Sequence, residues 1–329
     1  MRRLLPLLLV ALLAAPGTWV REPLPRPVYD NPMRFLPLPV DQAAARTSLS
    51  PFVLEGAWRI ASPHAWFGSF SALGSLGDGT LLAVSDRGYV LRFAPPGAPP
   101  SHPWLERILR DNSVEKRNND AEALTVHPPS GTFWIAWEDS NAISRHATGL
   151  TQEAYVRPQA MQDWGGNVGP ETLVRLANGK FLVLREGGDS LIDDSRHRAL
   201  LFHDDPADSQ RHIAFTFTGP EGFSPTDATQ LPDGRILVLM RKLLWPFPAR
   251  FAGRIMVVDP DSIEAGGEWT GPVVARLTSS LPVDNFEGIT VEPRDDGTVT
   301  VWLMSDDNDA SFQATVLWKL KLDPARLPH

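Results

Sequence analysis

The sequence predicts an all-β fold, a β-propeller, from three observations. Proline (31) and glycine (25) are abundant among the 329 residues, and long helical periodicity is missing. Short alternating segments are separated by turn residues, as in folds built from many strands. Finally, comparison of the chain with itself shows paired segments that recur every 49 to 60 residues, which is typical of a propeller or another repeat architecture.

The N-terminal part carries two segments outside the predicted propeller. Residues 1–20 begin with Arg2 and Arg3 and continue as an apolar run over 4–15, which predicts a signal peptide or an uncleaved N-terminal anchor. Residues 21–48 contain six prolines between Pro23 and Pro39 and predict an extended tether, with one helical turn at most near 42–46. We assign 49–325 to a single propeller domain.

Five units of paired strands build this domain. Turn sequences such as Asn178-Gly179 join the two strands of a pair, as tight hairpins require. The pairs are 70–73 with 79–86, 120–126 with 131–139, 170–174 with 179–186, 226–231 with 234–241, and 284–291 with 298–304.

Further strands follow the pairs at 89–93, 104–109, 199–203, 212–217, 254–259, 273–277 and 315–322. The fifth unit lacks an outer strand, and the strand-like segment 52–60 precedes the first unit. We therefore expect an N-terminal strand to complete the last blade and close the ring. Five blades fit the repeats, and a sixth blade of less regular sequence is the alternative.

Charge and cysteine content narrow the function. The net charge is −8, from 31 basic and 39 acidic residues, and no basic run is present, which argues against nucleic acid as a partner. The absence of cysteine excludes disulfides, a lipoprotein anchor and thiolate chemistry. Together with the export signal, this predicts a monomeric bacterial protein of the periplasm or the medium, with membrane contact only through an uncleaved N-terminal segment.

Two tiers of acidic residues follow from the repeats. Inner strands of a propeller surround its channel, so aligned residues form a ring. At the start of the first strands the aligned residues are Ser71, Glu122, Glu171, Asp227 and Glu287. At the end of the second strands they are Asp86, Glu138 with Asp139, Glu186, Arg241, and Asp306 with Asp307. So many carboxylates repel one another unless a cation or a basic group lies among them.

A hard divalent ion is the simplest such cation. Ca²⁺ takes six to eight oxygen ligands, which carboxylates from several rigid strands supply well. The predicted ligands are Glu122, Glu171, Asp227, Glu287 and Asp306, with a carbonyl oxygen from Asn285 or Asn119. The alternative is that these acids accept hydrogen bonds from loop amides and stabilise the starts of the blades without an ion.

Three arginines, one histidine and an insertion complete the candidate site. Arg87, Arg185 and Arg241 are predicted to hold a phosphate or carboxylate of an anionic small molecule, or to pair with neighbouring carboxylates. His64, before the first unit, is the candidate general base. The insertion 243–251 is either a wall over the mouth or a segment that packs on an adjacent blade.

Several of these segments resemble a known family. Phe286-Glu287-Gly288-Ile289 followed by Ser305-Asp306-Asp307-Asn308, the earlier 120–124, and Ser85-Asp86-Arg87-Gly88 are similar to the phytase-like propeller domain named for an esterase-like activity of phytase. The resemblance covers 67–322. It implies an exported bacterial propeller that hydrolyses phosphate or carboxylate esters.

Two functional hypotheses follow. The first is a Ca²⁺-dependent ester hydrolase with its active site at the acidic mouth of the channel. The second is a non-catalytic periplasmic propeller whose mouth binds a ligand or a protein and whose metal is structural. Arg241 departs from the acidic pattern in the fourth unit, which argues against a symmetric site with many calcium ions.

Overall fold

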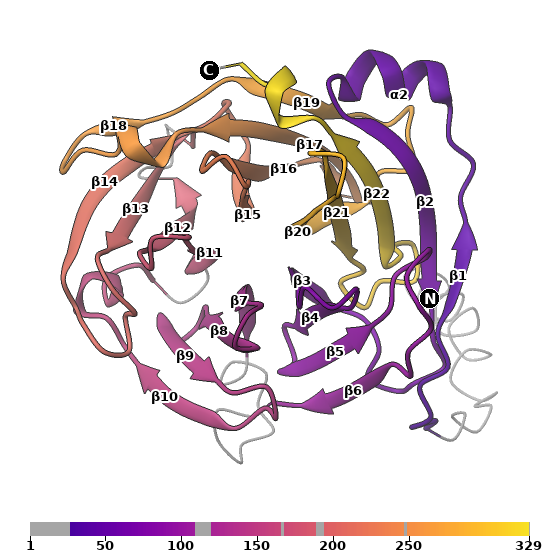
Figure 1. Ribbon diagram of the computed structural model, residues 1–329, viewed down its shortest axis with the longest axis horizontal. Coiled ribbons are helices and arrows are strands. Elements are labelled where there is room, and N and C mark those ends of the chain that lie inside the picture. Colours follow the sequence, from indigo (N-terminus) through magenta and orange to yellow (C-terminus); the bar gives the residue numbers. More distant parts are fainter. Residues whose placement is uncertain (1–26, 109–119, 166–167, 189–193, 247–248, 329) are drawn as a thin grey trace, which may run out of the picture.

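The structure, a computed structural model, describes residues 27–108, 120–165, 168–188, 194–246, 249–328. Five sheets, in which almost all strand pairs are antiparallel, stand around a central axis (Figure 1). This confirms the predicted five-bladed β-propeller. The first strand of every blade, one each of β3, β7, β11, β15 and β20, lies closest to the axis, and these five strands pack against one another in a ring.

The first three blades follow the order of the chain. The first contains β3 (Phe70–Ser75), β4 (Leu81–Ser85), β5 (Tyr89–Phe93) and β6 (Trp104–Arg107). The second contains β7 (Ala121–His127), β8 (Thr132–Trp137), β9 (Ala142–His146) and β10 (Gln152–Val156). The third contains β11 (Pro170–Arg175), β12 (Phe181–Gly188), β13 (Arg196–Phe202), β14 (His212–Thr218) and the short β18 (Glu268–Trp269), which pairs with β14 in parallel.

The last two blades use both ends of the chain. The fourth contains β15 (Ser224–Gln230), β16 (Ile236–Pro246), β17 (Ala249–Val258) and β19 (Val273–Leu277). The fifth contains β20 (Asn285–Pro293), β21 (Val299–Asp306), β22 (Val316–Leu322), β2 (Val53–Ala61) and β1 (Arg34–Pro37). Short 3-10 turns lie at η2 (Gln159–Met161), η3 (Pro260–Ser262) and η4 (Pro324–Arg326).

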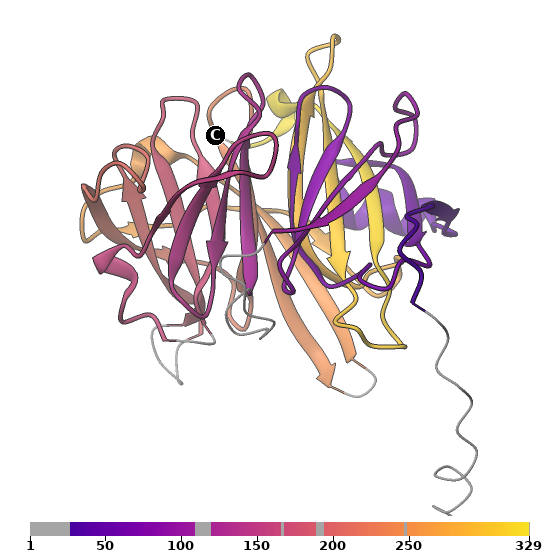
Figure 2. The ribbon, with the colours of Figure 1, turned by 90° about the horizontal axis from the view of Figure 1, so that it is seen from below.

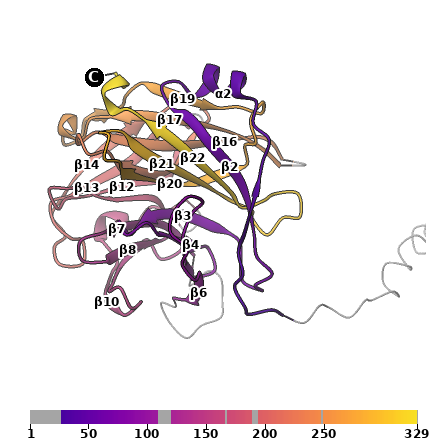
Figure 3. The same cartoon turned by 45° about the vertical axis from the view of Figure 1, so that its right-hand side comes forward.

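The N-terminal strand β2 closes the ring, as predicted. It pairs with β22 in antiparallel register, from Val53 opposite Lys321 to Arg59 opposite Val316 (Figure 3). The closure unites the start and the end of the domain in one sheet. Separation of the two ends therefore requires the loss of a complete strand pair.

The segment predicted as an unstructured tether is partly folded. Strand β1 pairs with β2 at the outer edge of the fifth blade. Helix α2 (Gln42–Leu49) follows, with Asp41 as its N-cap, and buries Ala45 and Leu49 against β2 and β19. The tether prediction was therefore wrong for 34–37, whereas the helical turn expected near 42–46 is present as part of the longer helix α2. The predicted signal segment, residues 1–20, lies outside the described residues.

The hydrophobic core lies between blades. The described core divides into five clusters, and each cluster joins two neighbouring blades. In one of them, Val84 of the first blade packs with Phe133 and Trp137 of the second. Blades packed face to face in this way hold their inner strands at fixed positions. Within the described residues, no helix is long and apolar enough to cross a membrane.

Candidate functional site

Each inner strand contains one residue that falls outside the pairing with the second strand. These residues are Ser71, Glu122, Glu171, Thr226 and Glu287. A β-bulge of this kind bends the strand and redirects a side chain. The sequence alignment was correct for four of the five blades. In the fourth it was wrong by one residue, because Thr226 and not Asp227 has the bulge position.

A second tier of residues lies on the second strands, one residue in each blade. Each of them is opposite the residue that stands two positions before the bulge residue. The backbone N–H groups of Asp86, Glu138 and Glu186 each donate to the carbonyl of the residue directly before the inner strand of the same blade; these acceptors are Ser69, Asp120 and Gly169. In the other two blades Arg241 pairs with Ser224, and Asp306 with Asn285. The predicted second tier of four acids and one arginine therefore has one equivalent position in every blade.

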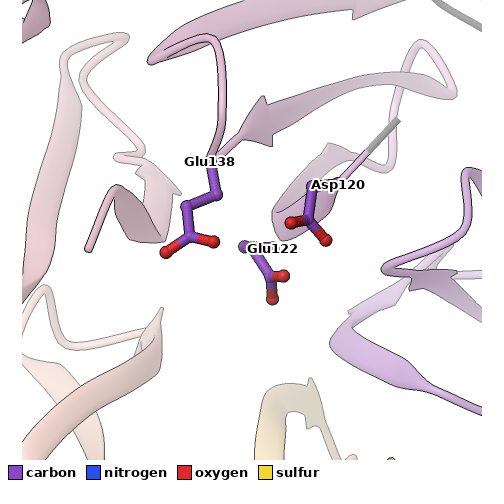
Figure 4. A group of neighbouring side chains, drawn as sticks. All are labelled: Asp120, Glu122 and Glu138. Carbon is purple, nitrogen blue, oxygen red and sulfur yellow. The ribbon is translucent and has the colours of Figure 1, made fainter. Parts of the chain in front are cut away.

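Carboxylates from the second and third blades meet at this end of the channel. The oxygens of Asp120, Glu122 and Glu138 lie within 4.8 Å of one another (Figure 4), as do those of Glu138, Glu171 and Glu186. Glu138 belongs to both groups. Two of the predicted ligands, Glu122 and Glu171, are therefore joined by three acids that we did not predict as ligands.

Burial and then neighbouring charges shift the pKa values of three of these acids, Glu122, Glu138 and Glu171. Burial, followed by the charges of Glu171 and Asp120, raises the pKa of Glu122 well above its ordinary value. Burial and then Glu186 raise the pKa of Glu171 in the same direction. Burial raises the pKa of Glu138 to about 7, although the N–H of Gly169 donates to its Oε1 at 3.2 Å and favours the ionised form. A bound cation would displace protons from such a cluster.

Arg241 neutralises the other side of the mouth. Its Nη1 donates to Asn285 Oδ1 at 2.9 Å and to Glu287, and its Nη2 donates to Glu186 Oε1 at 2.7 Å. Asn285 Nδ2 donates in turn to Glu287 Oε1 at 2.8 Å. Burial raises the pKa of Glu287 to about 7 despite the opposing effect of Arg241. The basic group that such an acidic ring requires is therefore part of the chain.

The two predicted aspartate ligands have different surroundings. Asp306 lies in the second tier, where burial and then Glu287 raise its pKa, and it accepts the N–H of Asn308 at 2.8 Å. Asp227 is completely buried and accepts the N–H groups of Ala228 and Ile289, each at 2.8 Å. Asp227 thus joins β15 to β20, in the manner of the ion-free alternative. Asn119 lies outside the described residues.

The remaining predicted side chains have other described partners. Arg87 pairs with Asp309 and donates to Ser69 Oγ at 3.3 Å, at the rim of the mouth. Arg185 donates through Nε to the carbonyls of Trp164 and Val168, both at 3.0 Å. His64 lies beside Tyr29, and its Nδ1 accepts the N–H of Trp66 at 3.2 Å. Among the contacts described, Arg241 is the predicted arginine that is bonded to Glu186 and Glu287.

The insertion in the fourth blade is a long hairpin. Strands β16 and β17 remain paired beyond Arg241, as far as Pro246 opposite Ala249. Figure 2 shows that this hairpin projects from the disc. Leu243 and Leu244 are each 51% exposed on it. Because Arg241 lies within β16, the hairpin stands on the same side as the acidic mouth and forms a wall beside it.

The opposite end of the channel is a cavity with different chemistry. A cavity of about 850 Å³ is lined there by the far ends of the inner strands. Its hydroxyl groups link blades, because Thr125 Oγ1 accepts the N–H of Arg175 and Thr290 Oγ1 accepts the N–H of Ser75. These polar groups are thus used by the fold. The convergent titratable groups mark the acidic mouth as the candidate site.

The acidic segments lie within a recognised family region. The family model "Phytase-like: Esterase-like activity of phytase" matches residues 65–309. The chain belongs to this phytase-like family. The match contains both acidic tiers and all five inner strands. No curated protein matches the chain.

Several solved structures are similar in fold. The glutaminyl cyclase of Myxococcus xanthus has 14% identity and a TM-score of 0.47 over 82% of this chain and 95% of its own. The nidogen/laminin complex has 11% identity and a TM-score of 0.45, over 89% of this chain and 99% of the matched chain. The hydrazine synthase of Kuenenia stuttgartiensis has 11% identity and a TM-score of 0.39, over 73% of this chain and 57% of its own. This chain thus spans little more than half of the hydrazine synthase chain.

Proposed function

We propose that this protein is a Ca²⁺-dependent hydrolase of phosphate or carboxylate esters that acts at the acidic mouth. The observation that carries the proposal is the meeting of Asp120, Glu122, Glu138, Glu171 and Glu186 in two groups that share Glu138. Membership in the phytase-like family supports an ester as the substrate.

The donor set fits a hard cation. Asp120, Glu122 and Glu138 come from two strands of one blade and supply only oxygen ligands, as Ca²⁺ prefers. Glu171 and Glu186 extend the set from the next blade. When bound, the cation would polarise the ester carbonyl or phosphoryl oxygen and neutralise the charge that develops on it.

Glu287 is the side chain best placed to accept a proton from water. Its pKa of about 7 means that a large part of it is ionised at neutral pH, which suits a general base. Arg241 and Asn285 hold its carboxylate by hydrogen bonds, so its orientation is fixed before a substrate binds. His64 has no comparable support, because its described partners are Tyr29, Ser62 and Trp66.

Arg87 is the residue that we assign to the anionic end of the substrate. Its partner Asp309 is 59% exposed in its side chain, and a surface ion pair of this kind contributes little to stability. A phosphate or carboxylate can therefore replace Asp309 at small cost. Arg185, whose Nε is held by two backbone carbonyls, is less suited to this role.

The test is hydrolysis by the purified protein of phytate, p-nitrophenyl phosphate, p-nitrophenyl acetate and lactones, with Ca²⁺ and with a chelator. We expect turnover of at least one ester that requires Ca²⁺ and is lost in Glu122→Gln and Glu287→Gln. Glu106→Gln, on the exposed outer strand β6, is the matched control and should retain full activity. Activity equal in all four proteins, or none on any ester, would overturn the proposal.

A further inference from the structure

We infer that Arg241 is a built-in cation that occupies a metal position of the mouth and prevents a divalent ion from binding between the third and fifth blades. The inference rests on the proposed function in one respect only, that divalent cations are ligands of this mouth. It assigns to Arg241 the control of how many cations the mouth binds.

The first argument is the position of Arg241 in the fold. It stands on the second strand of its blade, at the position where the other four blades have Asp86, Glu138, Glu186 and Asp306. The backbone there is held in the same register in every blade, so the position directs a side chain toward the mouth. A single positive charge at this position is therefore surrounded by acids of the neighbouring blades.

The second argument is what the guanidinium contacts. It donates to Glu186 Oε1, Glu287 and Asn285 Oδ1, that is, to two carboxylates and one amide carbonyl. These are the oxygen types that a hard divalent ion takes. The guanidinium thus binds as a cation in a cage of oxygens from the third and fifth blades, at a place that would otherwise hold buried, mutually repelling acids.

Glu186 connects this cage with the predicted cation groups. It is a member of the group Glu138, Glu171 and Glu186 and is also bonded to Arg241. A divalent ion at that group would compete with Arg241 for the same carboxylate. The group of Asp120, Glu122 and Glu138 does not include Glu186, so a cation there leaves the hydrogen bond to Arg241 intact. We therefore expect the wild-type mouth to favour one cation, on the second blade.

The arrangement also explains how Glu287 is kept separate from the metal. The guanidinium is part of the chain and always charged, so it cannot leave the site as a bound ion can. It therefore holds Glu287 both in the metal-free protein and in the protein with bound Ca²⁺. If a second divalent ion replaced Arg241, Glu287 would become its ligand. Arg241 is thus a positioning residue that reserves one carboxylate of the mouth for a role other than metal binding.

The experiment counts bound Ca²⁺ by native mass spectrometry and equilibrium dialysis in wild type, Arg241→Gln, Arg241→Lys and Arg87→Gln. We expect Arg241→Gln to bind one Ca²⁺ more per chain than the wild type. Arg241→Lys keeps the charge, and Arg87→Gln removes an arginine from the rim of the same mouth, so both should match the wild type. Methylguanidinium should compete with the additional Ca²⁺ of Arg241→Gln.

The outcomes separate this inference from the proposed function. If the wild type binds no Ca²⁺ and Arg241→Gln binds one, the inference stands and the proposed Ca²⁺ requirement fails. If the wild type binds Ca²⁺ and Arg241→Gln binds no more, the inference is overturned and the proposed function stands. If Arg241→Gln does not fold, Arg241→Glu, which completes the acidic tier, is prepared in millimolar Ca²⁺. If both variants fail to fold in Ca²⁺, a divalent ion cannot replace the guanidinium, and the inference is overturned.

Discussion

Replacement of Asp227 distinguishes a metal ligand from a structural acid. Its carboxylate is buried and accepts the N–H groups of Ala228 and Ile289, each at 2.8 Å. Asp227→Asn retains one acceptor oxygen and leaves one of these groups unsatisfied, whereas Asp227→Ala leaves both. Each buried donor without a partner costs about 1–3 kcal/mol. We expect the free energy of unfolding to fall by about 1–3 kcal/mol in Asp227→Asn and by about 2–6 kcal/mol in Asp227→Ala.

The assay is urea unfolding of the Ca²⁺-free proteins at neutral pH, with comparison of midpoints at equal slope. Thr226→Val is the matched control, because Thr226 is equally buried but its hydroxyl lies at 3.4 and 3.5 Å from its carbonyl partners, where hydrogen bonds are weak. It should unfold close to the wild type. The number of bound Ca²⁺ ions should be the same in folded Asp227→Asn and wild type. A loss of Ca²⁺ binding without a loss of stability would refute the structural role and restore Asp227 as a ligand.

Three further predictions concern the acids of the mouth. Glu138→Gln removes the carboxylate common to both cation groups and should weaken Ca²⁺ binding more than Glu186→Gln, which isothermal titration would show; equal affinities would contradict the shared position of Glu138. Gly169→Ala should lower the free energy of unfolding by about 1–3 kcal/mol and also weaken Ca²⁺ binding, because a Cβ there would lie 2.7 Å from Glu138 Cγ and 2.9 Å from the backbone of Glu138. Thermal unfolding measures the first effect and isothermal titration the second. A variant unchanged in both would refute the close approach. Burial raises the pKa values of Glu138 and Glu287 from 4.5 to about 7, which favours folding below pH 4.5, and this contribution to stability is lost as the pH rises through 7. Melting temperatures measured from pH 4.5 to 8 should show this loss in chelator and a smaller loss in Ca²⁺. A melting temperature that rises with pH in chelator would contradict the prediction.

The blade count and the closure could be predicted from the sequence because they depend on local signals. Turn residues such as Asn178-Gly179 mark where each hairpin reverses, and their spacing fixes the number of repeats. The bulge in the fourth blade could not be placed in the same way. A bulge shifts the register by one residue, and Thr226-Asp227 offers a polar side chain at both positions. In the other blades the residue after the bulge is alanine, threonine or glycine. An acidic residue of those inner strands could therefore be aligned only with the bulge position itself.

Features that depend on tertiary contacts were predicted less well. The proline-rich composition of 21–48 indicated an extended chain, but strand β1 forms because its neighbour β2 presents an open edge. Asp120 and Glu138 were present in the aligned segments, yet their meeting with Glu122 depends on the bulge that bends β7. The approach of Arg241 to Glu186 and Glu287 likewise crosses from one blade to the next, and no repeat within the sequence encodes such a contact.

The charge balance of the mouth could nevertheless be derived from the sequence. Aligned acids in a ring require positive charge among them, and two sources were open, an ion or a basic side chain. The structure provides the basic side chain on one side, where Arg241 is held by Glu186 and Glu287. On the other side Asp120, Glu122 and Glu138 gather in a group that does not include Glu186, the partner of Arg241. Because blades packed over five cores keep these acids buried and close together, burial and then the charges of neighbouring acids raise the pKa values of Glu122 and Glu138. The asymmetry introduced by one arginine thus separates the mouth into a half that is neutralised within the chain and a half for which we propose a bound cation.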